Sequence, residues 1–161
     1  MMEKPKLGMT RLGMTTTRRV ILLGLALTLL AGCDPPPPGR MRPYGCEIYL
    51  RGTFLDEDPD AGFAVCDGRN RLEYAGGTKY ACTLLVPAGS HRFKVADASW
   101  KAVNLGAFDF GVTLAPKTAY GACSGDGARD FLLEVAEAGR YTFEVHASNR
   151  AKPLIRYAKA R

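Results

Sequence analysis

The sequence predicts an all-β fold, a single β-sandwich, and three observations support this. Short segments alternate apolar and polar residues, as strands with one buried face do. Glycine and proline separate these segments at the spacing that is typical of sandwiches. Residues 44–161 contain no convincing long helical period, and they are enough for one domain with a modest core.

The expected strands follow one another from residue 46 onward. Residues 46–54 alternate Ile48, Leu50 and Phe54 on one parity. Residues 71–89 predict two strands around Gly76-Gly77, a strong hairpin signal, before Pro87-Ala88-Gly89 turns the chain. Residues 91–97 alternate again, with Phe93 and Val95 on one side and Lys94 on the other.

An internal repeat supports the same fold. The segment AGSHRFKVADA (88–98) aligns with AGRYTFEVHAS (138–148) at an offset of fifty residues. In both copies an Ala-Gly pair provides a turn and an alternating strand follows. Residues 130–139 are expected to be a strand that forms a hairpin with the second copy, and residues 124–127 a loop. A helical turn over 133–137 is an alternative that Gly139 disfavours.

The N-terminus carries an export signal. Arg18-Arg19 precede an apolar run, residues 20–31, which is too short for a helix across a bilayer core of about 30 Å. A charged stretch, a short apolar stretch and small residues are typical of a secretory signal. Leu30-Ala31-Gly32-Cys33 resembles the bacterial lipobox, which implies removal of residues 1–32 and a diacylglycerol on the Cys33 thiol. A plain signal peptide with an incidental Cys33 is the alternative.

Residues 33–43 are expected to be the lipidated cysteine and a proline-rich linker. Two or three acyl chains hold a protein stably on a membrane. Four consecutive prolines favour polyproline II, which makes a semi-rigid spacer. The expected location is therefore the bacterial cell envelope. Asp34 favours the periplasmic face of the inner membrane, by a rule for enterobacterial lipoproteins, and the outer membrane is the alternative.

The charge changes once the signal is removed. The whole chain carries +6, but residues 1–32 contain five of its 22 basic residues and one of its 16 acidic residues. The mature part keeps 17 basic and 15 acidic residues, a net charge of +2. Because no basic stripe with interleaved aromatic residues is present, nucleic acid is not an expected partner.

Four cysteines accompany the domain. An even number in an oxidising compartment predicts two disulfide bridges, in any of three pairings, among Cys46, Cys66, Cys82 and Cys123. No Cys-x-x-Cys pair occurs, and His91 and His146 are far apart in sequence. We therefore expect no metal site and no cofactor.

Several segments together resemble the accessory β-domain of bacterial pullulanases and, more distantly, glycogen- and starch-binding modules. They are IYLRGTF, YAGGTKYACTLLVPAG, FKVADASWKAVNLGA and AEAGRYTFEVHAS, within about residues 48–147. The resemblance implies an immunoglobulin-like β-sandwich over residues 44–161. In binding members, aromatic rings stack on glucose while a lysine and an asparagine bond its hydroxyls. By position, Trp100 would be the ring, Lys94 the donor and Asn104 a further contact.

The chain departs from this family after the first strand. Binding members usually carry Phe-Asn-x-Trp there, whereas Phe54 precedes an acidic loop with Asp56, Glu57, Asp58 and Asp60. The loop lacks the glycine and the closing glutamate of an EF-hand, so we expect a solvated loop rather than a Ca²⁺ site. A second aromatic wall beside Trp100 would have to come from Tyr74, Tyr80 or Phe108.

The sequence does not predict an enzyme. It lacks nucleophile-elbow, zinc-protease and phosphate-loop motifs, and the pairs Glu134/Glu137 and Glu144/His146 are expected to be surface charge. The first hypothesis is a membrane-anchored lipoprotein that binds an α-glucan or another envelope glycan. The second is a structural or protein-interaction envelope lipoprotein without a sugar site. In the second, Trp100 caps the sandwich and Lys94 protects an edge strand.

Overall fold

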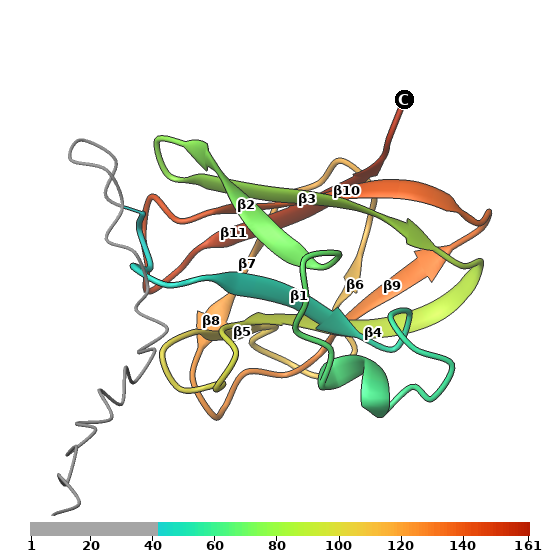
Figure 1. The fold of residues 1–161 in the computed structure, drawn as a ribbon, viewed down its shortest axis with the longest axis horizontal. Helices are drawn as coiled ribbons and strands as arrows, with labels where there is room; N and C mark the ends of the chain where they lie inside the picture. Colours follow the sequence, from blue (N-terminus) through green and yellow to red (C-terminus); the bar gives the residue numbers. More distant parts are fainter. Residues whose placement is uncertain (1–41) are drawn as a thin grey trace, which may run out of the picture. The chain divides into compact units, whose positions relative to one another are not determined.

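The computed structural model describes residues 42–161, which form two packed layers of β-strands (Figure 1). One layer contains β1 (Ile48–Gly52), β4 (Gly89–Ala96), β9 (Phe131–Val135) and β6 (Thr113–Leu114), with β5 (Asn104–Gly106) and β8 (Cys123–Ser124) attached beside β4. The other contains β3 (Lys79–Val86), β10 (Gly139–His146), β11 (Leu154–Lys159) and β7 (Tyr120–Gly121). β2 (Arg71–Gly76) pairs with both β1 and β3. The expected all-β fold is confirmed.

The predicted hairpin around Gly76-Gly77 is present. β2 and β3 pair antiparallel, with Tyr74 opposite Tyr80. Both glycines adopt the left-handed conformation, with φ of 97° and 60°. Side chains with a Cβ resist this conformation, so the two glycines account for the position of the turn.

The predicted hairpin between β9 and β10 is wrong. β9 pairs with β4 and β6 in one layer, whereas β10 pairs with β3 and β11 in the other. The turn before Gly139 therefore carries the chain from one layer to the other. Alternation tells which face of a strand is buried, but two strands that face one core from opposite layers have the same pattern as two neighbours in one sheet.

The internal repeat corresponds to two such crossings. The first leads from β3 into β4 and the second from β9 into β10. Gly89 pairs with Val135, and Gly139 pairs with Val86, so the two crossings lie side by side. The equivalent phenylalanines of the two copies, Phe93 and Phe143, meet in the core with ring centroids 5.4 Å apart.

Aromatic side chains fill the space between the layers. Phe93 is fully buried and also stacks on Phe131 at 5.5 Å, while Phe143 stacks on Phe54 at 5.9 Å and on Tyr157 at 5.9 Å. Offset and edge-to-face pairs of this kind add to the free energy gained by burying the rings. This cluster holds the two layers in a fixed relation.

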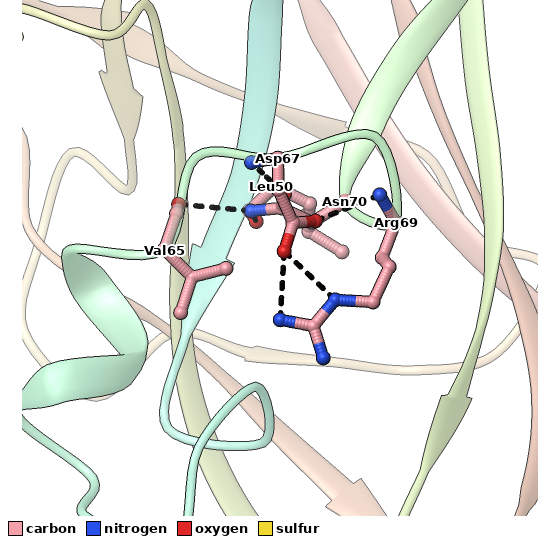
Figure 2. A network of polar contacts seen from close by, with 5 residues as sticks. All are labelled: Leu50, Val65, Asp67, Arg69 and Asn70. Atoms are coloured by element: carbon pink, nitrogen blue, oxygen red, sulfur yellow. Dashed lines mark hydrogen bonds and ion pairs between the residues drawn. The ribbon is translucent and has the colours of Figure 1, made fainter.

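The loop between β1 and β2 is tied to β1 by a buried asparagine (Figure 2). The Asn70 amide donates to the carbonyl oxygens of Leu50 at 2.7 Å and Val65 at 3.0 Å, and its Oδ1 accepts the Asp67 N–H. Arg69 forms an ion pair with Asp67 at 2.7 Å. These bonds hold residues 65–70 of the loop against β1, and the same loop contains the short 3-10 helix η1 (Ala61–Phe63).

The acidic stretch of this loop is exposed. Asp56 and Asp58 each accept the main-chain N–H two residues further on, at 3.1 and 3.0 Å. Such local bonds shape a turn without any ligand. Within residues 42–161, no three His, Cys, Asp or Glu side chains gather in a way that could hold a metal ion.

The expected disulfides do not form, since Cys66, Cys82 and Cys123 carry free thiols. Cys82 points into the core from β3, and burial raises the pKa of its thiol to about 12. The Cys123 Sγ lies 3.2 Å from the carbonyl oxygen of Ala107, and Cys66 is exposed on the β1–β2 loop. An even number of cysteines does not bring their side chains together, and here they point into different parts of the domain.

The predicted signal peptide, Cys33, Asp34 and all but the last two residues of the predicted linker lie outside the described residues. Within residues 42–161, we find no helix that is long and apolar enough to cross a membrane.

Candidate functional site

The three side chains that the family resemblance indicates gather on one face of the β4 layer. Lys94 on β4 pairs with Arg51 on β1, and Asn104 on β5 pairs with Ala96. Directly paired residues project to the same side of a sheet. Lys94, Arg51 and Asn104 therefore project away from the core, into which Val95 points. We call this side of the layer the outer face.

Trp100 lies over the outer face, on the loop of residues 97–103 between β4 and β5. Its ring centroid is 4.5 Å from the Arg51 guanidinium carbon and 5.8 Å from the Lys94 Nζ. Because Arg51 and Lys94 are cross-strand neighbours, the indole covers the pair. The ring is partly exposed, and its backbone adopts a left-handed conformation with φ of 63°, which is uncommon for a residue with a side chain.

Asp97 holds this loop in place. Its nearly buried carboxylate accepts the main-chain N–H groups of Ser99 at 2.9 Å, Ala102 at 3.0 Å and Val103 at 2.8 Å, together with the Ser99 hydroxyl. Burial works to raise the pKa of Asp97, but these hydrogen bonds outweigh it and lower the pKa. The loop that carries Trp100 is thus fixed from within.

Arg51 is a buried cation beneath Trp100, and sequence reasoning missed it. Only 2% of the residue is exposed. Its guanidinium donates to the carbonyl oxygens of Phe63 at 3.0 Å, Asp97 at 3.0 Å and Ala98 at 3.1 Å. Within the described part of the chain it has no ion-pair partner. Arg51 therefore joins the Trp100 loop to the β1–β2 loop.

Lys94 offers a polar group beside the ring, and Asn104 offers another on the same face. The Lys94 Nζ donates to the carbonyl oxygen of Ala128 at 2.8 Å, and burial is the main cause that lowers its pKa. The Asn104 Oδ1 is buried and accepts no hydrogen bond within residues 42–161. A buried acceptor without a donor is unfavourable, so rotation of the Asn104 amide toward a ligand hydroxyl would gain a bond.

None of the three aromatic residues proposed as a second wall contacts Trp100. Tyr74 and Tyr80 pack on each other at 5.5 Å in the β2–β3 hairpin. Phe108 is exposed, but its ring lies near Gly121 of β7. The condition under which one of these three residues would replace the missing second aromatic wall is therefore not met.

A different ring, Phe110, lines a groove on the outer face, and sequence reasoning also missed it. Phe110 is 79% exposed, and the guanidinium of Arg129 lies 4.3 Å from its ring centroid. The groove has a volume of about 300 Å³ and is lined by Arg92, Phe110, Gly111, Ala128, Arg129, Asp130 and Leu132. Arg92 pairs with Leu132, two residues along β4 from Lys94, so the groove adjoins the Trp100 site.

A comparison with solved structures agrees with this architecture. A structure described as "Ligand induced structure of AmyP-SBD", a starch-binding domain, aligns with a TM-score of 0.56 over 96% of this chain and 97% of its own. The chain shares the fold of that domain. Only 22% of the residues are identical, so the likeness concerns the fold alone. No protein-family model and no curated protein matches the sequence.

Glu144 and His146 lie on the opposite layer and form part of an ion-pair cluster. The Glu144 carboxylate contacts Lys79 and Arg156 and lies 3.6 Å from the His146 Nε2. Burial works to raise its pKa, but the hydrogen bonds and charges of Arg156 and Lys79 outweigh it and hold the pKa at about 2. The other acidic pair, Glu134 and Glu137, does not act together. Glu137 binds Lys159, while Glu134 accepts a hydrogen bond from the Ser90 hydroxyl.

We expect the Glu144 cluster to make the stability of the domain pH-dependent. Because the folded pKa lies below the usual 4.5, the stabilisation is complete above that value and is lost as the pH falls towards 2. Urea unfolding at a series of pH values would measure this loss. Glu144→Gln should remove much of the difference between pH 6 and pH 3, and an unchanged pH profile in that variant would contradict the assignment.

Proposed function

We propose that the outer face binds a carbohydrate and that the chain is a membrane-anchored, non-catalytic glycan-binding lipoprotein. One observation carries the proposal: Trp100, Lys94 and Asn104 lie together on the outer face of a domain that shares its fold with a starch-binding domain. An α-glucan or another glycan of the cell envelope would be the ligand.

The chemistry of the site suits a pyranose. The apolar face of the sugar packs on the free part of the indole, because both surfaces gain by leaving water. The partly desolvated Lys94 ammonium donates to a hydroxyl oxygen, and a charged donor makes a stronger bond than a neutral one. Asn104 is partly exposed, and its amide turns outward so that the unpaired Oδ1 accepts a hydroxyl proton. Ring and polar groups together fix the orientation of the sugar.

Fluorescence of the single tryptophan tests this proposal directly. We expect maltoheptaose and glycogen to cause a saturable change in Trp100 emission in the full chain, purified in mild detergent. Lys94→Ala should weaken binding roughly tenfold or more, the size expected for a charged hydrogen bond. Lys101→Ala removes an exposed lysine from the same loop and should bind normally. Absence of any response to both glycans would overturn the glucan assignment.

Two contacts favour the second candidate, a structural or protein-interaction lipoprotein. Trp100 already packs on Arg51, and Lys94 already donates to Ala128. Both side chains would then complete the sandwich and need no ligand. A blue Trp100 emission that iodide fails to quench and glycans fail to change would favour this candidate over the first.

The membrane anchor rests on Cys33, which lies outside the described residues. We expect Cys33→Ser to move the protein from the membrane fraction to the soluble fraction of the cell, because the variant cannot accept diacylglycerol on a thiol. Cys66→Ser, at an exposed cysteine of the domain, is the matched control and should stay on the membrane. Membrane association of the Cys33 variant would refute the anchor.

A further inference from the structure

The groove beside Phe110 contains a cation without a counter-charge. Arg129 is exposed on the outer face and forms no ion pair with any of residues 42–161. Its guanidinium lies against the Phe110 ring instead. A cation–π contact limits the positions of both side chains and leaves the other donors of the guanidinium available.

The second arginine of the groove differs in this respect. Arg92 lies 3.6 Å from the Asp130 carboxylate and 3.8 Å from the Asp60 carboxylate, so its charge is balanced. Lys94 has no carboxylate within ion-pair distance among the described residues, and its Nζ bonds the carbonyl of Ala128, a residue of the groove wall. The charges of Asp126 and Asp130 nevertheless act on Lys94. Among the described residues, Arg129 is therefore the groove arginine that has no carboxylate at ion-pair distance.

We propose that the Phe110 groove binds a carboxylated pyranose, so that the ligand of the outer face is an acidic glycan. The sugar carboxylate bonds the Arg129 guanidinium, which matches it with two parallel N–H groups. The pyranose packs beside Phe110, and Asp130 accepts a hydroxyl proton. This inference rests on the proposed glycan-binding function and names its ligand class.

The size and position of the groove agree with one sugar unit of a longer chain. Its volume of about 300 Å³ is at the lower end for small-molecule sites. Lys94 contacts both the Trp100 ring and the groove wall, so it stands between the two aromatic side chains. An oligosaccharide that passes over Lys94 would contact Trp100 with one unit and Phe110 with another.

The test compares two hexasaccharides of equal length, the acidic hexagalacturonate and the neutral maltohexaose. Both are titrated by calorimetry into the full chain in mild detergent at near-physiological salt. We expect hexagalacturonate to bind at least about tenfold more tightly. Arg129→Gln should remove that preference by weakening the binding of hexagalacturonate far more than the binding of maltohexaose, whereas Phe110→Ala should weaken the binding of hexagalacturonate. Arg140→Gln, at an exposed arginine of β10 in the other layer, is the charge-matched control and should behave as the natural chain.

Each other outcome overturns the inference. Tighter or equal binding of maltohexaose would refute the acidic ligand and leave the proposed glycan-binding function intact, while binding of neither would remove both. Loss of affinity in Arg140→Gln as large as in Arg129→Gln would show a general charge effect without a site. Polyglutamate has carboxylates but no sugar ring. If it displaces hexagalacturonate as well as an acidic sugar does, binding depends on charge alone and not on a sugar site.

Discussion

Phe93→Ala is expected to lower the free energy of unfolding by about 3–5 kcal/mol, the usual loss for a large aromatic side chain in a core. Phe93 is fully buried, and its ring contacts Phe54, Phe131 and Phe143 at centroid distances of 6.4, 5.5 and 5.4 Å. Truncation removes these contacts and leaves a cavity between the layers. Since domains of this size are stable by only about 5–15 kcal/mol, this loss is a large fraction of the total.

Urea unfolding, followed by far-ultraviolet circular dichroism, measures this loss. Leu85→Ala is the control, because Leu85 is 69% exposed on β3 and its truncation should change stability by no more than about 0.5 kcal/mol. A double-mutant cycle with Phe143→Ala should give a coupling energy of about 0.5–3 kcal/mol, since the two rings are in contact. Additive losses would contradict a direct contact between the two copies of the repeat.

The same two phenylalanines show how far sequence reasoning reaches. Alternation and the Ala-Gly turns predict the strands that contain Phe93 and Phe143, and those strands are present as β4 and β10. The pairing of the strands was harder to predict. A turn that stays in one layer and a turn that crosses between layers differ in direction, and the local pattern of the flanking strands is the same in both.

On the outer face, too, only some of the site residues could be predicted from the sequence. Resemblance to a family placed Trp100, Lys94 and Asn104 together, and the structure brings them to one face. Arg51 was missed because an arginine in a strand is normally exposed, and its burial depends on two loops that are distant in sequence. Phe110 lies in a loop without any periodic pattern, and only the folded chain shows that it lines a groove.

Arg51→Ala is expected to lower the free energy of unfolding by about 3 kcal/mol. The change leaves the carbonyl groups of Phe63, Asp97 and Ala98 without their donor, and an unsatisfied buried polar group costs about 1–3 kcal/mol. It also removes the guanidinium on which the Trp100 ring packs. We therefore expect the emission of this single tryptophan to shift to longer wavelength in the native state, before any urea is added.

Two further variants separate the causes. Arg51→Lys keeps a positive charge but lacks the planar fork that reaches three carbonyls, so it should also destabilise the domain and displace Trp100. Arg140→Ala removes an exposed arginine from the other layer and should change stability by less than about 0.5 kcal/mol. If Arg51→Ala has the same native emission and the same stability as Arg140→Ala, the structural role of Arg51 is contradicted.

The Arg51 variants also decide what Trp100 does. Because only 2% of Arg51 is exposed, it has almost no surface for a glycan, and any effect on binding must pass through the side chains above it. A folded Arg51→Lys with red-shifted Trp100 emission and weakened glycan binding would place Trp100 in the binding site. The same shift with unchanged glycan affinity would mean that the ring only seals a buried cation, and that recognition lies elsewhere on the outer face, with Phe110 and Arg129 as the first residues to test.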